Sequence, residues 1–288
     1  MAPDRGLQGV ECVMQNLLFS SVAGPRGQEA RAPVEPQAGA SYSVVCMNVQ
    51  NPGASRVDRL VQWFADQSPD VLVLSELQVK PACETLLAEL GALGYAVTPL
   101  DGPQRTYHSV IASRLVCEEL PVATRSLRHR VRVVSIKTPN GRLIIVGAYG
   151  PSFNAQNIEN RRAFLNDFHA NVMSRLGGVK DAAIIAGDLN IVEPDFHDHV
   201  PDQVVSDRLI YQGFGALGFK DCVRAAYAEN AVYTWYSPRT FEGQRLDHLF
   251  ANAAAKPWVS RIAVDHTARL NKLTDHSSIM AQVTTPAG

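Results

Sequence analysis

The sequence contains no long apolar run. None of its 288 residues belongs to a stretch near the roughly 18 consecutive apolar residues of a membrane-spanning helix, which excludes an integral membrane protein. An excess of charge of one sign is also missing, because 27 Lys and Arg stand against 28 Asp and Glu. A protein that binds nucleic acid through bulk positive charge is therefore excluded, whereas a nucleic-acid enzyme with a local basic face is not.

Cysteines are few, and their spacing has no metal-binding pattern. There are five, an odd number, so neither a disulfide framework nor a zinc site is expected. We therefore expect a reducing, cytoplasmic setting. His197 and His199 lie two residues apart without an obvious third ligand, and we do not interpret them as a zinc site.

The length and composition are those of a globular protein with a sizeable core. Hydrophobic residues make up 46% of the chain, and α/β enzymes often form one domain of about 250 residues. Residues 1–40 are rich in Ala, Pro, Gly and charge and show no periodicity, so we predict a disordered leader. Residues 41–288 are predicted to form the folded domain.

From Ser41 onward, short apolar runs alternate with amphipathic segments. Pro139-Asn140-Gly141 is a hairpin signal between two of the runs. Strands mixed with helices, some of them linked by hairpins, predict an α/β sandwich with mixed sheets. We predict strands at 43–47, 71–74, 109–112, 131–136, 143–146 and 182–186, and around 233–235, 246–250 and 277–283. We predict helices at 57–64 with Ser55 as N-cap, and at 81–93, 157–176 and 204–217.

Several of these strands end in polar residues that a core would exclude. Ligands of open α/β sheets gather at strand ends, so convergence of these tips would form a polar pocket. The residues concerned are Asn48, Glu76, Tyr149, Asp188, Asn190, Asp247, Asp275 and His276.

Four carboxylates in one pocket would raise one another's pKa unless positive charge compensates them. Oxygen ligands without clustered cysteines favour Mg²⁺, or alternatively Mn²⁺, over zinc. A carboxylate beside a histidine also supplies an acid–base pair. Together these groups suit the attack of water on a phosphate ester.

At these residues the sequence resembles the endonuclease/exonuclease/phosphatase superfamily, and within it the exonuclease III-type abasic-site endonucleases. The resemblance implies a four-layer α/β sandwich of two packed mixed β-sheets flanked by helices, with the site at one end of the sheets. The motifs run in order from about residue 42 to residue 284: Met47-Asn48-Val49, Ser75-Glu76, Ala148-Tyr149-Gly150-Pro151, Gly187-Asp188-Leu189-Asn190, Tyr233-Thr234-Trp235, Arg245-Leu246-Asp247 and Thr274-Asp275-His276.

The same resemblance implies a role for each residue. Glu76 would be the principal metal ligand, supported by Asn48 and Asp275. The catalytic residues would be Asp188, which orients or deprotonates water, Asn190 and Tyr149 at the phosphate, and His276, held by Asp247, at the phosphoryl oxygen. The motifs leave open which residue is the base.

Substrate-binding residues are predicted at Trp235, Arg245 and Asn154. Trp235 is either part of an aromatic loop with Tyr236 and Phe241 that enters a DNA groove, or a core residue. The arginines at 125, 128, 130 and 132 either track phosphates or form the solvated face of a strand.

The function that we predict is that of a Mg²⁺-dependent phosphodiesterase acting on DNA, as an abasic-site endonuclease or 3′-exonuclease. A phosphatase or lipid phosphodiesterase acting on a small phosphorylated metabolite is the alternative, because one fold serves both. A non-catalytic binding protein is disfavoured because Glu76, Asp188, Asn190, Asp247 and His276 are all present. We expect a monomer.

Overall fold

The computed structural model describes residues 32–153, 158–194 and 201–287, and the side chains of residues 201–206 are left out of the description. The predicted leader, residues 1–40, falls largely outside this range. Its last part, from residue 32, runs along the domain, where the Val34 amide donates to the Arg114 carbonyl at 2.8 Å. No helix in the described part of the chain has the length and apolar character required to cross a bilayer.

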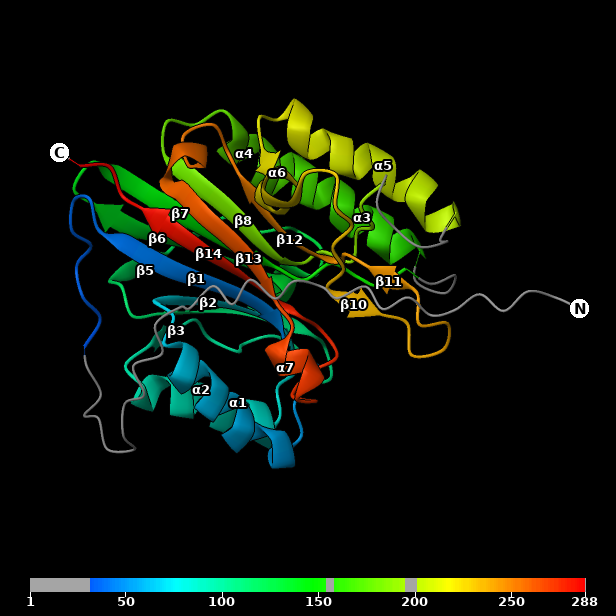
Figure 1. Ribbon diagram of the computed structural model, residues 1–288, viewed down its shortest axis with the longest axis horizontal. Coiled ribbons are helices and arrows are strands. Elements are labelled where there is room, and N and C mark those ends of the chain that lie inside the picture. The colour runs from blue at the N-terminus through cyan, green and yellow to red at the C-terminus, as the bar shows by residue number, and fades with distance from the viewer. Residues whose placement is uncertain (1–31, 154–157, 195–200, 288) are drawn as a thin grey trace, which may run out of the picture.

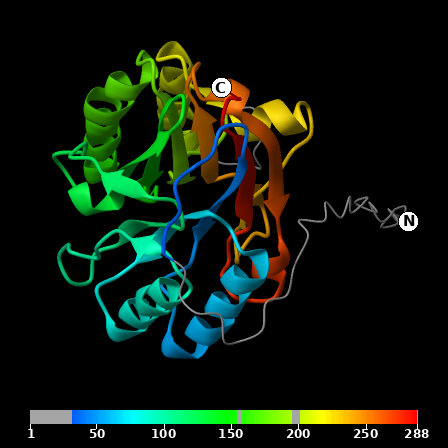
Figure 2. The same cartoon turned by 90° about the vertical axis from the view of Figure 1, so that its left-hand side faces the viewer.

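Two six-stranded sheets face each other and confirm the predicted sandwich (Figures 1 and 2). In order across the first sheet, the strands are β13 (Val259–Asp265), β14 (Ser278–Thr284), β1 (Ser41–Asn48), β2 (Val71–Leu77), β4 (His108–Ser113) and β3 (Ala96–Val97). Across the second they are β5 (Cys117–Glu119), β6 (Val131–Thr138), β7 (Gly141–Ala148), β8 (Ala182–Asp188), β12 (Asp247–Ala251) and β9 (Lys220–Asp221). A separate ribbon pairs β10 (Trp235–Tyr236) with β11 (Gly243–Gln244).

The two sheets repeat the same pairing pattern. Each has one parallel pair at its centre, β1 with β2 and β7 with β8, and every other neighbouring pair is antiparallel. A parallel pair needs a crossover, which is usually helical. α1 (Ala54–Gln67) supplies it in the first sheet, and α3 (Ile158–Phe168), the π-helix η2 (His169–Met173) and α4 (Ser174–Gly177) supply it in the second.

Helices cover the outer face of each sheet, which gives four layers (Figure 2). α1 and α2 (Pro81–Ala92) lie on the first sheet, whereas α3, α4 and α5 (Pro201–Ala216) lie on the second (Figure 1). The remaining short helices are α6 (Cys222–Tyr227), α7 (Thr267–Leu270) and the 3₁₀ turns η1 (Arg128–Arg130) and η3 (Lys256–Trp258).

Side chains alternate between two cores along each central strand. In β1, Val44 and Cys46 join the core between the sheets, whereas Val45 and Met47 pack under α1 and α2. Because successive side chains of a strand point to opposite faces, a strand buried on both faces reads as one continuous apolar run. This is why the central strands were visible in the sequence.

Some local predictions were wrong. Ser55 lies inside α1, and the N-cap is Gly53, which makes no side-chain capping bond. Arg128 and Arg130 form the turn η1 rather than a strand. The strand β13 was not predicted, because its half-exposed sequence lacks an apolar run and β14 supplies its pairing.

Gly187 in β8 permits the close approach of β7. Its φ is +148°, and a Cβ there would lie 1.8 Å from the Ala148 carbonyl oxygen. We expect Gly187→Ala to lower the unfolding free energy by about 3 kcal/mol, because strain and the clash combine. Urea unfolding measures this loss.

Gly141→Ala is the matched control. Gly141 has a φ of +134° but nothing within 4 Å of its added Cβ, so we expect a loss of only about 1 kcal/mol from strain. Equal losses in the two variants would show that the contact with Ala148 is unimportant.

Candidate active site

The polar strand ends converge where the two parallel pairs finish. β1 ends at Asn48, β8 ends at Asp188, and Glu76 stands near the end of β2. Tyr149 follows β7 directly, and its amide donates to the Arg130 carbonyl at 2.9 Å. Because parallel neighbours end at the same edge of a sheet, one end of the sandwich collects side chains from both sheets.

A buried histidine–carboxylate pair forms the centre of the site. His276 Nδ1 lies 2.7 Å from Asp247 Oδ2, and its Nε2 lies 3.9 Å from Asp188 Oδ2. All three residues are buried. The register of β12 and β8 aligns Asp247 with Asp188 directly across the two strands, so the sheet itself sets the spacing of these carboxylates.

These charges shift one another's ionisation. Burial opposes the charged form of His276, but Asp247 outweighs it and raises the pKa of His276 to about 10. Burial, followed by the charge of Asp247, raises the pKa of Asp188 to about 8. Both shifts favour the protonated form, which for His276 is the imidazolium, and they make Asp188 an unusually basic carboxyl group.

Asn48, at the end of β1, contacts both Asp188 and His276. Its Nδ2 donates to Asp188 Oδ2 at 2.8 Å and lies 3.5 Å from His276 Nε2. Its Oδ1 accepts from the Gln50 amide at 2.7 Å, which fixes the orientation of the side-chain amide. Asn48 thus orients one carboxylate oxygen of Asp188.

Glu76 and Tyr149 meet across the two sheets. The Tyr149 hydroxyl donates to Glu76 Oε1 at 2.7 Å. Burial and then the charge of Glu76 raise the pKa of Tyr149, so the hydroxyl stays protonated and remains a donor. Glu76 has a φ of +60°, at an irregularity in the pairing of β2 with β4. A non-glycine residue in this region is strained, which is common at functional sites.

Arg130 belongs to the site, whereas Arg132 does not. The Arg130 guanidinium carbon lies 4.6 Å from the centre of the Tyr149 ring, and its Nε and Nη1 are buried without a hydrogen-bond partner in the described structure. Arg132 pairs with Asp101 and Glu119. These arginines therefore do not form the solvated face of one strand, because Arg128 and Arg130 belong to η1 and Arg132 is paired with carboxylates.

Trp235 contacts an acidic residue rather than the core alone. Its Nε1 donates to Asp275 Oδ2 at 3.2 Å, and its ring packs against Val192 and Leu246. The other oxygen of Asp275 is buried without a hydrogen-bond partner in the described structure. Tyr236 and Phe241 of the following loop are exposed, Phe241 by 79%.

One cluster of three residues, and two further carboxylates, have the chemistry to hold a cation. Ligand atoms of Asp188, Asp247 and His276 lie within 4.8 Å of one another, but the imidazolium already neutralises part of this group. Glu76 and Asp275, two of the three metal residues predicted from the sequence beside Asn48, offer carboxylate oxygens, and Asp275 Oδ1 has no hydrogen-bond partner in the described structure. Hard oxygen donors of this kind fit a divalent cation such as Mg²⁺.

Arg245 is not placed to bind substrate as predicted. Its side chain is fully buried, with Nη2 2.6 Å from Asp221 Oδ2 and Nε 2.9 Å from Glu193 Oε2. Its Nη1 lies 3.1 Å from His248 Nδ1.

The structure does not describe three residues discussed from the sequence. These are Asn154, the third predicted substrate residue, and the two histidines His197 and His199.

Asn190 curls back over the end of β8. Its amide donates to Asp188 Oδ1 at 2.9 Å, and its side-chain Nδ2 donates to the Gly150 carbonyl at 3.0 Å. Its φ of +50° is in the left-handed region, which asparagine tolerates better than most residues. Sequence reasoning considered Arg130 only as one of four arginines. It missed Tyr107, whose ring meets that of Tyr149 edge-on at 5.7 Å between centroids, because Tyr107 stands in no local motif.

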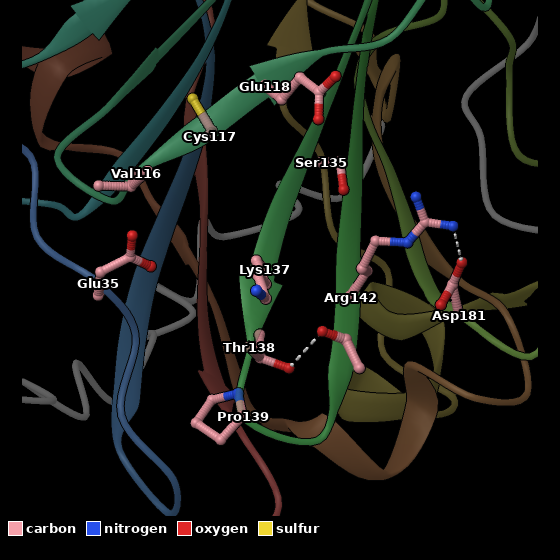
Figure 3. Close-up of a pocket in the computed structure, with 11 residues that line it drawn as sticks. Glu35, Val116, Cys117, Glu118, Ser135, Lys137, Thr138, Pro139, Arg142 and Asp181 are labelled. Carbon is pink, nitrogen blue, oxygen red and sulfur yellow. Dashed lines mark hydrogen bonds and ion pairs between the residues drawn. The ribbon is translucent and has the colours of Figure 1, made fainter.

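A separate pocket lies at the other end of the second sheet (Figure 3). It is lined by the β6–β7 hairpin, by β5 and by Asp181 just before β8, and therefore by the starts of the parallel strands. Arg142 pairs there with Asp181 at 2.8 Å. The predicted site residues belong to the opposite end.

The chain belongs to the endonuclease/exonuclease/phosphatase family, whose model matches residues 45–276. Members of this family are hydrolytic nucleases and phosphatases, so the chain is an enzyme of the phosphoric ester hydrolase class. A search of curated proteins found no match.

Solved structures share the fold. The chain is similar to the 3′ phosphatase NExo from Neisseria bound to product DNA hairpin, with a TM-score of 0.70, 23% identity and coverage of 84% of this chain and 99% of that one. It is also similar to an AP endonuclease from Archaeoglobus fulgidus, with a TM-score of 0.70, 21% identity and coverage of 83% and 98%. A third is truncated TDP2 from Caenorhabditis elegans, with a TM-score of 0.63, 16% identity and coverage of 86% and 99%.

The buried side chain of Arg245 binds two carboxylates and should stabilise the fold. Arg245→Met leaves the carboxylates of Glu193 and Asp221 without their central cation, and we expect the unfolding free energy to fall by about 3–5 kcal/mol. Burial opposes ionisation of Asp221, but Arg245 lowers its pKa well below the usual range. The stabilisation is therefore present above about pH 4 and is lost as the pH falls further.

Urea unfolding at pH 7 and at acidic pH measures both effects. Arg239→Met, in the exposed loop after β10, is the control and should change stability by less than about 0.5 kcal/mol. If Arg245→Met is as stable as the wild type, the ion-pair role assigned to Arg245 is wrong.

Proposed function

We propose that the protein is a Mg²⁺-dependent DNA phosphodiesterase of the abasic-site endonuclease or 3′-end-processing kind. The observation that carries this proposal is a set of buried hydrogen-bond donors and acceptors that have no hydrogen-bond partner in the described structure. The donors are Arg130 Nε and Nη1, and the acceptors are one carboxylate oxygen each of Asp247 and Asp275. Buried polar groups are rarely left unpaired. The donors suit a phosphate oxygen, and the acceptors suit a cation or a polar hydrogen of the substrate.

The acid–base groups suit hydrolysis by water. Asp188, oriented by Asn48 and by the Asn190 amide, would accept the proton of the attacking water in its ionised form, which the positive charge of a nearby cation would favour. The His276 imidazolium, held by Asp247, would donate a hydrogen bond to a phosphoryl oxygen and stabilise its developing charge. The Tyr149 hydroxyl and the Arg130 guanidinium would orient the phosphate from the second sheet. A divalent cation bound at Glu76 and Asp275 would neutralise phosphate charge.

The rim of the site favours a polymer over a small metabolite. Tyr236 at the end of β10 and Phe241 on the loop between β10 and β11 are exposed, and the Arg269 guanidinium carbon lies 4.6 Å from the centre of the Tyr236 ring. Exposed aromatic side chains with arginine beside them suit contact with bases and backbone phosphates. The similarity in fold to NExo bound to a DNA hairpin and to an AP endonuclease supports the same substrate class.

The activity is tested on a labelled DNA duplex that carries one abasic-site analogue, with Mg²⁺ or with chelator. We expect metal-dependent cleavage at the analogue, and a loss of about 100-fold or more in Asp188→Asn because a general base is removed. Gel electrophoresis measures the product. Asp66→Asn, an exposed aspartate on α1, is the control and should cleave normally.

Other outcomes of this assay would contradict the proposal. Release of inorganic phosphate from phosphorylated metabolites, without cleavage of damaged, intact or single-stranded DNA, would contradict a DNA substrate and identify a phosphatase. Full activity of Asp188→Asn would contradict the role of this carboxylate whatever the substrate.

The cation site is tested by binding, independently of turnover. With Mn²⁺ as the probe, electron paramagnetic resonance should show a bound ion in the wild type and at least about tenfold weaker binding in Glu76→Gln, because a carboxylate ligand is neutralised. Glu118→Gln, on the edge strand β5, should bind Mn²⁺ as the wild type does. Equal binding in the three proteins would exclude Glu76 as a ligand.

A further inference from the structure

The segment that leaves β8 is fixed by hydrogen bonds to its backbone as well as to its side chains. We call residues 188–193, which begin with the last residue of β8, the catalytic loop. It carries Asp188 and Asn190, and Asn190 adopts a left-handed conformation with a φ of +50°. Strained conformations persist only where the surroundings over-determine them. The contacts of Asp188 and Gly150 with Asn190 fix its amide and its side chain, which leaves its carbonyl to be held from another direction.

A buried ion pair between two helices holds that carbonyl. Arg161 of α3 donates from Nη2 to the Asn190 carbonyl at 2.8 Å and to Asp207 Oδ1 of α5 at 2.5 Å. Asp207 Oδ2 in turn accepts from the Val192 amide at 3.0 Å. One ion pair therefore binds a carbonyl and an amide of the catalytic loop, two residues apart.

The energetics of the pair favour a role in geometry over one in stability. Arg161 is 1% exposed and Asp207 is fully buried. Removing two charges from water costs several kcal/mol, so a buried ion pair contributes little net stability compared with apolar residues of the same volume. The pair does satisfy two backbone groups in a loop that departs from the sheet, which apolar side chains cannot do.

A second buried cluster, His248 and Arg245, binds Ile191 and Glu193 of the same loop. His248 Nε2 lies 2.7 Å from the Ile191 carbonyl, and its Nδ1 faces Arg245, which also binds Glu193. The carbonyls of Asn190 and Ile191 are thus bound by two different buried side chains. With both carbonyls held, a shift of the loop requires breaking buried, charge-assisted hydrogen bonds.

We propose that Arg161, through its ion pair with Asp207, is a positioning residue for hydrolysis, because it holds the catalytic loop at the conformation in which Asp188 and Asn190 face the phosphate. This inference rests on the proposed function for its kinetic test. Its structural content, that the ion pair sets the loop conformation, stands independently of the substrate.

The test compares variants on the same helix. Arg161→Gln and Asp207→Asn each remove one charge of the pair and keep a polar side chain. Arg161→Lys keeps the positive charge but lacks the planar guanidinium that donates to both the Asn190 carbonyl and Asp207. Arg162→Gln, at the neighbouring exposed position, is the matched control. On the abasic-site duplex with Mg²⁺, we expect kcat to fall about 10- to 100-fold in Arg161→Gln and Asp207→Asn, with KM within about twofold, because misplacement of reacting groups slows the chemical step.

Arg161→Lys should recover part of the lost kcat, and Arg162→Gln should be unchanged. Circular dichroism and the thermal midpoint establish that each variant is folded at the assay temperature. Wild-type kcat in folded Arg161→Gln and Asp207→Asn would overturn the proposal. A fall in kcat that only matches a fall in the folded fraction would overturn it as well.

Hydrogen exchange supplies a readout that needs no substrate. In peptides covering residues 188–193, amide exchange should be faster in Arg161→Gln and Asp207→Asn than in the wild type, whereas peptides of β1 and β2 should exchange as before. Unchanged exchange in the loop would overturn the proposal. If the wild type cleaves no DNA, the proposed function fails, and the exchange result alone decides whether the ion pair sets the loop.

Discussion

Everything at the site depends on where two parallel pairs of strands end. The helical crossovers between β1 and β2 and between β7 and β8 place the carboxyl ends of these four strands at one end of the sandwich. Because the sheets pack face to face, Asn48 of one sheet then reaches Asp188 of the other at 2.8 Å. Neither sheet alone carries all of the groups that we propose for hydrolysis.

The concentration of charge at this end requires compensation from the protein. Asp188 and Asp247 stand directly opposite each other in adjacent strands, and like charges at such positions destabilise a sheet. The His276 imidazolium lies between them, and Asn48 donates to one of them. Polar atoms that stay unpaired here identify where a substrate and a cation would complete the charge balance.

Behind the reacting groups lies a second layer of buried charge. Arg161 binds a backbone carbonyl of the catalytic loop, and Arg245 binds the carboxylate of Glu193. These arginines are among the most fully buried side chains of the described structure. A connecting loop is normally mobile and exposed. Here the buried side chains of Arg161, Asp207 and His248 bind backbone groups of the loop and restrain it.

The central strands, the mixed α/β sandwich and the residues at the strand ends follow from the amino-acid pattern, because strands buried on both faces read as apolar runs and polar residues after such runs stand out. Three features emerge only in the folded chain: the pairing of the half-exposed β13, the place of Arg130 over Tyr149, and the burial of Arg245 among Glu193 and Asp221. These features depend on partners far away in the chain. Periodicity and motifs report on local backbone geometry, whereas the partner of a charge is set by which elements the fold brings together.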